Sequence, residues 1–323
     1  MCPSDRWHRR GFVVALGAAA WTHAWAQAIK PLRIVVPFTP GGSTDILARA
    51  LAPRLQQALG QTVVIDNKPG AGGSIGAAEA ARAEADGHTL LMGHIGTLAV
   101  NPALYPKLAY DPLKSFVPVA WVARVPNVLA VPASAPSVTL QAFIERARAN
   151  PGRLTYSSGG NGSAAHISYE LLKLRAKIFV THIPYRGAAP AVSDVIAGQV
   201  DSVFTGTPAV LPHVKSGRLR ALAVSSPERI AALPDVPTVA ESYAGFDADQ
   251  WYGIVAPTGT PSERITRLNA EINKALGSLD VMQQLALEGA IAAPNTPQAF
   301  GALIAREIPR WAEVVRAGNV KPD

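Results

Sequence analysis

A short buried strand that runs into a glycine-rich turn and then a helix is the feature that most constrains this chain. The run Leu32–Val36 is apolar, rich in β-branched residues and followed by a proline, which is typical of a buried parallel strand. Gly41 and Gly42 form the turn, and apolar residues at helical spacing begin at Ile46. A strand, a turn and a helix in this order predict an α/β fold.

This turn has two possible functions. Paired glycines let the backbone approach a ligand closely, and the first N–H groups of the following helix are available to bind an anion. Alternatively, it is an ordinary βα turn in which Gly42 or Ser43 caps the helix. Asp45 lies in the first helical turn, where we expect it to accept hydrogen bonds from turn amides or to bind a polar or cationic group of a ligand.

The same design recurs later in the chain. Residues 154–157 read as a strand, the Gly/Ser-rich run Ser158–Ser163 follows it, and a helix carrying His166 comes next. A further strand, 88–92, opens onto Gly96 and Thr97. Because ligands of open α/β sheets bind at the carboxyl ends of strands, we expect these loops to face one cleft.

The chain length and the alternating pattern predict two lobes. A chain of 323 residues favours two domains, and helical and strand-like stretches alternate throughout it. Two stretches, near residues 122–127 and 247–252, read as crossings between the lobes. We therefore predict one lobe from residues 29–123 plus 249–323, and a second lobe from residues 124–248.

Residues 1–28 have the pattern of a cleaved export signal. Three arginines precede an uncharged, mostly apolar stretch at 11–20, and two small-x-small cleavage sites follow at 24–26 and 26–28. The stretch is too short for a good membrane span. We therefore predict a periplasmic protein that is cleaved near residue 26 or 28. The pair Arg9-Arg10 leaves a twin-arginine export route open, and an amphipathic N-terminal helix of the mature domain is the alternative to a signal.

The charge of the chain disfavours a nucleic-acid partner. Removing residues 1–28, which hold three arginines and one aspartate, lowers the net charge from +7 to +5. The remaining lysines and arginines are scattered rather than clustered, which argues against nucleic-acid binding, and a mild positive balance suits an anionic ligand. Cys2 is the only cysteine and leaves with the signal, so we expect a mature chain without a thiol.

The residues in these loops are those of a binding site rather than a reaction centre. Ser163 and His166 are three residues apart, without the G-x-S-x-G elbow of a serine hydrolase. Seven scattered histidines and no mature cysteine argue against a zinc site, and we expect His88 and His94 to be surface or internally satisfied side chains. We therefore predict a non-enzymatic binding protein with no catalytic residues, no metal and no cofactor.

Seven stretches in a fixed order resemble the Bug family, the extracytoplasmic solute receptors of tripartite tricarboxylate transporters. These stretches are 34–45, 67–76, 101–105, 162–166, 184–187, 222–224 and 233–238. The resemblance implies a Venus-flytrap fold similar to type II periplasmic binding proteins, with two interlobe crossings. It also implies capture of a small carboxylate or related organic anion and its delivery to membrane permease subunits. We expect the receptor to be a monomer.

With this resemblance in hand, we expect thirteen residues of the strand-end loops to form the ligand site. They are Phe38, Gly41, Gly42, Ser43, Asp45, Gly96, Thr97, Asn161, Gly162, Ser163, His166, Tyr185 and Asp201. Two other functions stay open at this point. One is a sensory receptor that feeds a two-component system, and the other is an enzyme.

Overall fold

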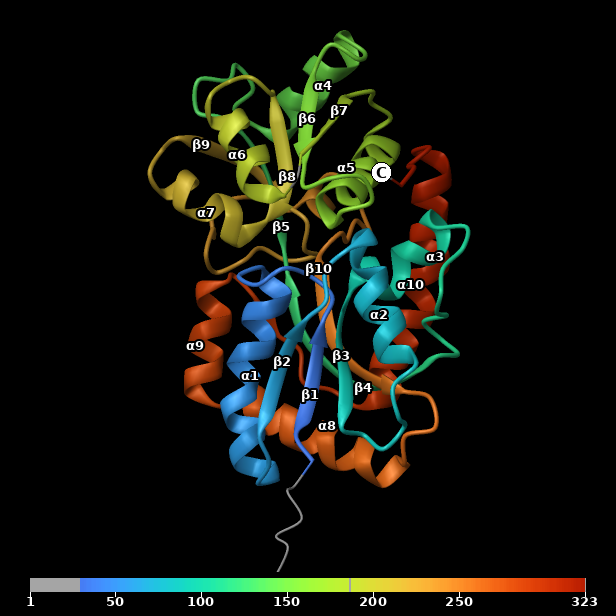
Figure 1. Ribbon diagram of the computed structural model, residues 1–323. Coiled ribbons are helices and arrows are strands. Elements are labelled where there is room, and N and C mark those ends of the chain that lie inside the picture. The colour runs from blue at the N-terminus through green and yellow to red at the C-terminus, as the bar shows by residue number, and fades with distance from the viewer. Residues whose placement is uncertain (1–29, 186, 323) are drawn as a thin grey trace, which may run out of the picture.

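Two β-sheets, one in each lobe, form the framework of the protein (Figure 1). The computed structural model describes residues 30–185 and 187–322, so the predicted export signal lies outside the described residues. Each sheet is covered by helices on both faces, which confirms the predicted two-lobe α/β fold.

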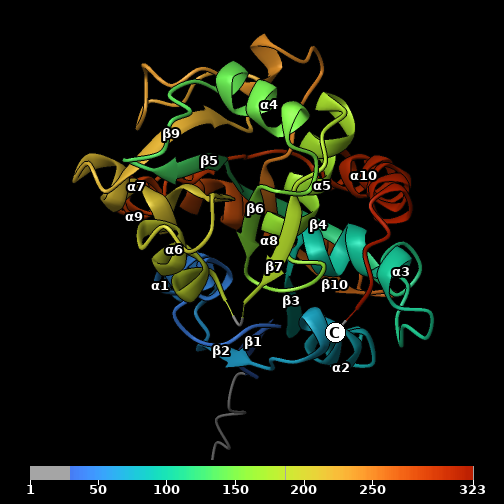
Figure 2. The ribbon, with the colours of Figure 1, turned by 90° about the horizontal axis from the view of Figure 1, so that it is seen from above.

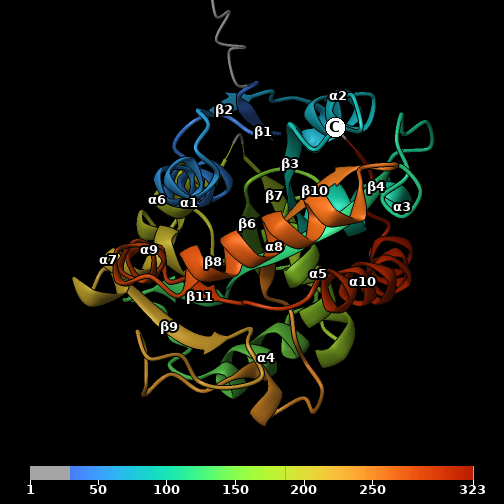
Figure 3. The ribbon, with the colours of Figure 1, turned by 90° about the horizontal axis from the view of Figure 1, so that it is seen from below.

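The first sheet has the strand order β11-β4-β10-β3-β1-β2. Its strands are β1 (Leu32–Val36), β2 (Val63–Asn67), β3 (Thr89–His94), β4 (Phe116–Val125), β10 (Gln250–Pro257) and β11 (Ile291–Ala292). Three helices pack on one face, namely α1 (Ser43–Leu59), α8 (Ser262–Leu276) and α9 (Leu279–Leu287). The other face carries η1 (Ala71–Gly73), α2 (Ser74–Ala81), η2 (Gly96–Val100), α3 (Asn101–Leu104) and α10 (Pro297–Ala317). Figure 3, seen from below, shows α8 crossing under this sheet.

The second sheet has the order β7-β6-β8-β5-β9. Its strands are β5 (Asn127–Pro132), β6 (Thr155–Ser158), β7 (Thr181–Pro184), β8 (Ser202–Gly206) and β9 (Leu219–Val224). One face packs against α4 (Leu140–Ala149) and α5 (Ala164–Ala176), and the other against α6 (Ala188–Ile196) and α7 (Thr207–Lys215) (Figure 2). The short η3 (Val239–Glu241) lies in the return to the first sheet.

Strand direction brings the loops of both lobes to one place. In the first sheet β1 runs parallel to β2 and β3, and in the second sheet β6 runs parallel to β7 and β8. The carboxyl ends of these strands therefore lie at one edge of each sheet, and the two edges face one another (Figure 1). The strand β10 is antiparallel to β3, so it begins at the same edge.

Helix starts and stops follow local chemistry. Thr139 and Thr296 accept hydrogen bonds from the third residue beyond them and cap α4 and α10, as their side chains favour. Gly60 ends α1 in the left-handed conformation. Pro53 lies inside α1 without breaking it. Because Pro53 is exposed, water is available to the carbonyl that loses its hydrogen bond.

The two passages of the chain between the sheets meet at Asn127. The first passage runs from β4 through Pro126 into β5, and the second ends at β10. The buried side-chain amide of Asn127 donates to the carbonyl oxygen of Ala248 at 2.7 Å and to the hydroxyl of Ser168 at 3.0 Å. Its oxygen accepts a hydrogen bond from Gln250 at 2.8 Å. The two passages are thus tied together by one side chain.

Helix α10 links the lobes a third time. It packs on η2, α3 and β4 of the first lobe and reaches α5 of the second (Figure 1). Trp311 of α10 belongs to a hydrophobic cluster that includes residues of both lobes, such as Leu91 and Tyr169. One of the three apolar clusters of the described residues is therefore continuous from lobe to lobe, while the other two each belong to a single lobe.

Candidate functional site

A cavity of about 730 Å³ lies where the two sheet edges face one another. Its first-lobe wall comes from the β1–α1 turn, the end of β3, the start of β10 and the end of α9. Its second-lobe wall comes from the loops that precede α5, α6 and α7 and from the first turns of those helices. The cavity is therefore built by strand-end loops of both lobes, as the sequence predicts.

The β1–α1 turn is held in shape by Asp45. Gly41 adopts φ +83°, and its amide donates to the Asp45 carboxylate at 2.9 Å. Arg49 and Asn67 donate to the same carboxylate at 2.9 and 3.0 Å. Burial raises the pKa of Asp45, but these three hydrogen bonds outweigh it and hold the pKa below its ordinary value. This confirms the first of the two roles expected for Asp45, because the carboxylate accepts a turn amide.

His94, the last residue of β3, lines the cavity between two aromatic rings. Phe38 contacts it edge-on at 5.3 Å between centroids, and Tyr252 lies at 5.2 Å. Burial lowers the pKa of His94 to about 4, so the ring is neutral at pH 7. Its Nδ1 accepts the amide of Gly96 at 3.0 Å, which assigns the proton to Nε2. The neutral ring therefore carries one N–H donor, and Gln250 forms a hydrogen bond with it.

The loop before α5 is organised by His166. Its Nδ1 accepts the amide of Gly162 at 3.1 Å, while its own amide donates to the hydroxyl of Ser163, which caps α5. Burial, followed by the nearby His182 and Lys173, lowers the pKa of His166 to about 3. Gly162 adopts φ +69°, a conformation that favours glycine. His166 thus acts behind Ser163 rather than in the cavity.

Four helices begin at the cavity wall. Ser43 starts α1, Ala164 starts α5, Ala188 starts α6, and Thr207, just before the lining residue Pro208, starts α7. The first amides of a helix have no partner within it and carry a partial positive charge. In α7 the first of these amides, that of Thr207, donates to the carbonyl oxygen of Pro126, and Pro208 has no N–H, so α7 offers fewer free donors. Among the described residues of the lining there is no lysine or arginine. An anion in this cavity would therefore be held by backbone amides and neutral donors.

Five of the thirteen expected site residues line the cavity. They are Phe38, Gly41, Gly42, Ser43 and Ser163. Five others lie directly behind these or behind His94, where they shape the turns. They are Asp45, Gly96, Thr97, Gly162 and His166. Asn161 lies in the loop before α5 and is not a lining residue.

Tyr185 and Asp201 do not line the cavity. The hydroxyl of Tyr185 donates to Asp194 of α6 at 2.5 Å, so this ring packs on α6. Burial, then Asp194, raises the pKa of Tyr185 to about 12. Asp201 precedes β8 and accepts hydrogen bonds from the amide and hydroxyl of Thr155 at the start of β6. The amino ends of β6 and β8 lie at the edge of the sheet opposite the cavity. Asp201 therefore stabilises the pairing of these strands and is not part of the cavity wall.

Several lining residues were not expected from the sequence. They are His94, Gly159, Gly187, Ala188, Ala189, Val192, Ser193, Thr205, Gly206, Pro208, Ala209, His213, Gln250, Tyr252 and Glu288. Of the two alternatives expected for His94, a surface or a satisfied side chain, the second is confirmed, since the buried ring accepts the Gly96 amide and bonds to Gln250, but the ring also lines the cavity. Its place at the end of a strand was the available signal. Thr205 and Gly206 carried the same signal, whereas nothing in the pattern marked Glu288.

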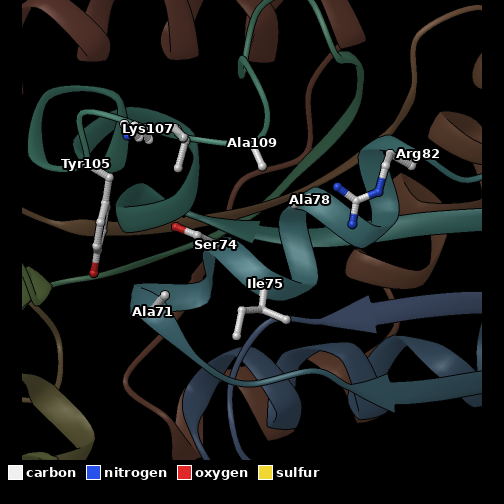
Figure 4. Close-up of a pocket in the computed structure, with 9 residues that line it drawn as sticks. Ala71, Ser74, Ile75, Ala78, Arg82, Tyr105, Lys107 and Ala109 are labelled. Carbon is white, nitrogen blue, oxygen red and sulfur yellow. The ribbon is translucent and has the colours of Figure 1, made fainter.

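A second, smaller pocket of about 310 Å³ lies away from the cavity, between α2 and residues 105–109 (Figure 4). Ser74 and Ile75 of α2 and Arg82 directly after it form one side, and Tyr105 and Lys107 form the other. Across residues 30–185 and 187–322, no group of three His, Cys, Asp or Glu side chains is arranged to hold a metal ion. Within the same residues, no helix has the length and apolarity that a membrane span requires.

Comparison with known proteins agrees with this architecture. The model of the tripartite tricarboxylate transporter family receptor matches residues 47–320. Protein BugT of Bordetella pertussis is 42% identical over 312 residues, which cover 96% of each chain. A solved periplasmic transporter is 41% identical, with a TM-score of 0.81 over 92% of this chain and 100% of the other. A protein of R. palustris solved with adipate is 37% identical, with a TM-score of 0.82 over 93% of this chain and 100% of the other.

The match covers most of the chain, and the relatives share both the sequence and the two-lobe fold. The resemblance seen in the sequence is thereby confirmed, and the family is one of transport receptors and periplasmic binding proteins rather than enzymes. This protein belongs to the tripartite tricarboxylate transporter receptor family, also called the Bug family.

Proposed function

We propose that the protein captures a small carboxylate between its lobes and delivers it to the membrane subunits of a tripartite transporter. The observation that carries this proposal is the convergence of four helix N-termini on one cavity whose described lining holds no lysine or arginine. Partial charges on amides bind a carboxylate without a buried cation. The adipate held by the R. palustris relative supports this ligand class.

In this proposal the ligand contacts the amides of the β1–α1 turn and of the loop before α5. Phe38, Gly41, Gly42, Ser43 and Ser163 line the proposed site. His94, Gln250 and Tyr252 extend it as neutral hydrogen-bonding groups. Asp45 and His166, which lie behind the two turns and accept backbone amides from them, hold the turns in shape.

Export precedes binding in the proposed function. The relatives are periplasmic, and residues 1–28 have the composition of a cleaved signal. Lobe 1 would comprise residues 29–123 and 249–323, and lobe 2 residues 124–248, with the receptor acting as a monomer. A sensory receptor would use the same binding site, so a membrane permease that takes the ligand from this protein distinguishes transport from sensing.

Calorimetry with a panel of carboxylates tests the ligand class. The panel should include adipate, malate, hexanoate and aspartate, with a sugar and a nucleotide as controls. We expect stoichiometric binding of at least one acid without added metal, together with a rise in melting temperature, because a ligand of the native state stabilises it by mass action. Binding of only the sugar or the nucleotide would contradict the proposal.

Two variants of Ser43 test where the carboxylate lies. Ser43→Pro removes the first amide of α1, and proline is well tolerated at this first helical position. Ser43→Ala is the matched control, since it loses the hydroxyl but keeps the amide. We expect Ser43→Pro to bind about tenfold more weakly than Ser43→Ala, as befits one hydrogen bond to a charged group. Equal affinities, with intact circular dichroism, would place the carboxylate elsewhere.

A further inference from the structure

Glu288 is an acidic side chain in the wall of a cavity that is otherwise suited to anions. It follows the last residue of α9, is half-buried, and is one of the lining residues. Figures 1 and 3 both place α9 next to α7 of the other lobe. Gly289, the next residue, packs so closely on Thr207 that a Cβ atom there would lie 2.8 Å from the threonine side chain. Glu288 is therefore held where the two lobes meet.

The carboxylate of Glu288 has no partner among the described residues. None of their donors forms a hydrogen bond or an ion pair with it. At the start of the nearby α7, the amide of Thr207 donates to the carbonyl oxygen of Pro126 at 2.9 Å, and Pro208 has no N–H. Burial alone raises its pKa above the ordinary value. Buried carboxylates in proteins normally have a donor, because an unpaired one loses solvation without compensation, and the half-buried Glu288 bears part of that cost.

The fold does not require this carboxylate. The end of α9 is made by the backbone, where the amide of Glu288 donates to the carbonyl oxygens of Gln284 and Leu285. A glutamine at this position would make the same backbone contacts. The acid is therefore available for a role in the cavity.

The other titratable groups that the structure describes in the lining do not offset the charge. His94 is neutral, as described above. Burial and the adjacent Arg218 lower the pKa of His213, which also disfavours its charged form. A ligand that placed a second carboxylate near Glu288 would meet a like charge, whereas a ligand with an N–H donor there would satisfy it.

We propose that Glu288 selects ligands that combine a carboxylate with an N–H donor, an ammonium or amide group, at the end that faces α9. The carboxylate lies on the amides of α1 and α5, and the nitrogen donates to Glu288. This inference rests on the proposed function, since it names the kind of carboxylate that the same cavity takes.

Three ligands of one chain length test the selectivity by calorimetry: hexanoate, 6-aminohexanoate and adipate. We expect the wild-type protein to bind 6-aminohexanoate at least about tenfold more tightly than adipate. Glu288→Gln should reduce this preference about tenfold or more, because the amide neither attracts an ammonium group nor repels a carboxylate. The corresponding shorter series, butanoate, 4-aminobutanoate and succinate, extends the test to smaller ligands.

Glu313→Gln is the matched control. Glu313 is exposed on α10 and outside the cavity lining, so this variant has the same change in charge and should keep the wild-type preference. A wild-type preference for the diacid, or an unchanged ratio in Glu288→Gln, would overturn the inference while leaving a carboxylate receptor in place. If no member of either series nor of the earlier panel binds, the proposed function fails as well.

Discussion

At the scale of single residues, the cavity depends on side chains that are neutral because they are buried. His94 is 8% exposed and lies between Phe38 and Tyr252, and its ring accepts a backbone amide. The hydroxyl of Tyr252 forms hydrogen bonds with Gln250 and Ser43. The resulting chain of neutral groups runs from the β1–α1 turn to Asn127 at the crossing. These groups place hydrogen-bond donors in the cavity wall without adding a charged side chain there.

The buried histidines predict that acid destabilises the protein. The folded pKa of His94 is about 4 and that of His166 about 3, below the ordinary value of 6.5. Between pH 6.5 and 4 the unfolded chain therefore binds protons that the folded chain does not, so the free energy of unfolding falls as the pH falls. For His94 alone the loss amounts to about 3 kcal/mol.

Two carboxylates with raised pKa values, Asp249 and Glu288, oppose this effect. Burial, with a contribution from Asp247, raises the pKa of Asp249 to about 6, so its protonation stabilises the folded state as the pH falls through that value. His94, His166 and His213 act in one direction, and the lowered pKa of Asp45 adds to their effect below pH 4, whereas Asp249 and Glu288 act in the other, so we expect the net slope to favour neutral pH. Urea unfolding at several pH values checks this, and His94→Gln should flatten the slope. An equally steep slope in His94→Gln would contradict the assignment of a neutral ring.

At the scale of elements, four helix starts form the cavity wall, and the long helix α10 holds the two lobes together. Two of the four helix starts, those of α1 and α5, were predicted from their Gly/Ser loops. The starts of α6 and α7 reach the cavity because β7 and β8 run parallel to β6 through the sheet. Helix α10 joins the two lobes through Trp311, whose Nε1 donates to the buried Glu307 at 2.8 Å.

Trp311 offers a test of how strongly α10 holds the two lobes together. The side chain is fully buried in the cluster that spans both lobes. Trp311→Ala should lower the free energy of unfolding by about 4 kcal/mol, as expected for a large side chain removed from a core. Trp311→Phe should lower it by about 1–2 kcal/mol, because the ring is kept but the hydrogen bond to Glu307 is lost. Urea denaturation measures both, and a loss below about 1 kcal/mol for alanine would show that α10 is not part of the shared core.

At the scale of the whole molecule, the two passages at Asn127 are where the lobes would rotate. Arg124 forms ion pairs with Asp247 and Asp249 beside these passages, at 3.2 and 2.9 Å. Arg310 of α10 also bonds to the carbonyl of Asp247. These bonds, together with α10, which packs on both lobes, hold the lobes together at the crossings, so a rotation of the lobes would take place about this region.

Small-angle scattering tests this rotation. We expect the radius of gyration to decrease when the protein is saturated with the acid that it binds, because closure brings the two cavity walls together. A non-binding sugar at the same concentration is the control. An unchanged scattering curve, together with unchanged tryptophan fluorescence, would contradict a flytrap that closes on its ligand.

The sequence by itself determined the order of the elements and the class of the fold. Apolar runs and glycine turns are local signals, and they placed β1, β3 and β6 close to their observed bounds. The signals extended to the site where a loop directly follows a strand, as at Gly41–Ser43 and Ser163. These features depend on neighbours along the chain, which a sequence displays.

Only the tertiary structure decided which side chains reach the cavity. Tyr185 follows β7 at the correct edge, yet its hydroxyl bonds to Asp194 of α6. Asp201 lies before β8 rather than within it, which puts it at the opposite edge. Glu288 enters the wall because α9 packs on α1 and its last turn meets α7 of the other lobe. Contacts of this kind join residues far apart in the chain. Packing of the elements decides which side chains meet, and no local sequence pattern shows this.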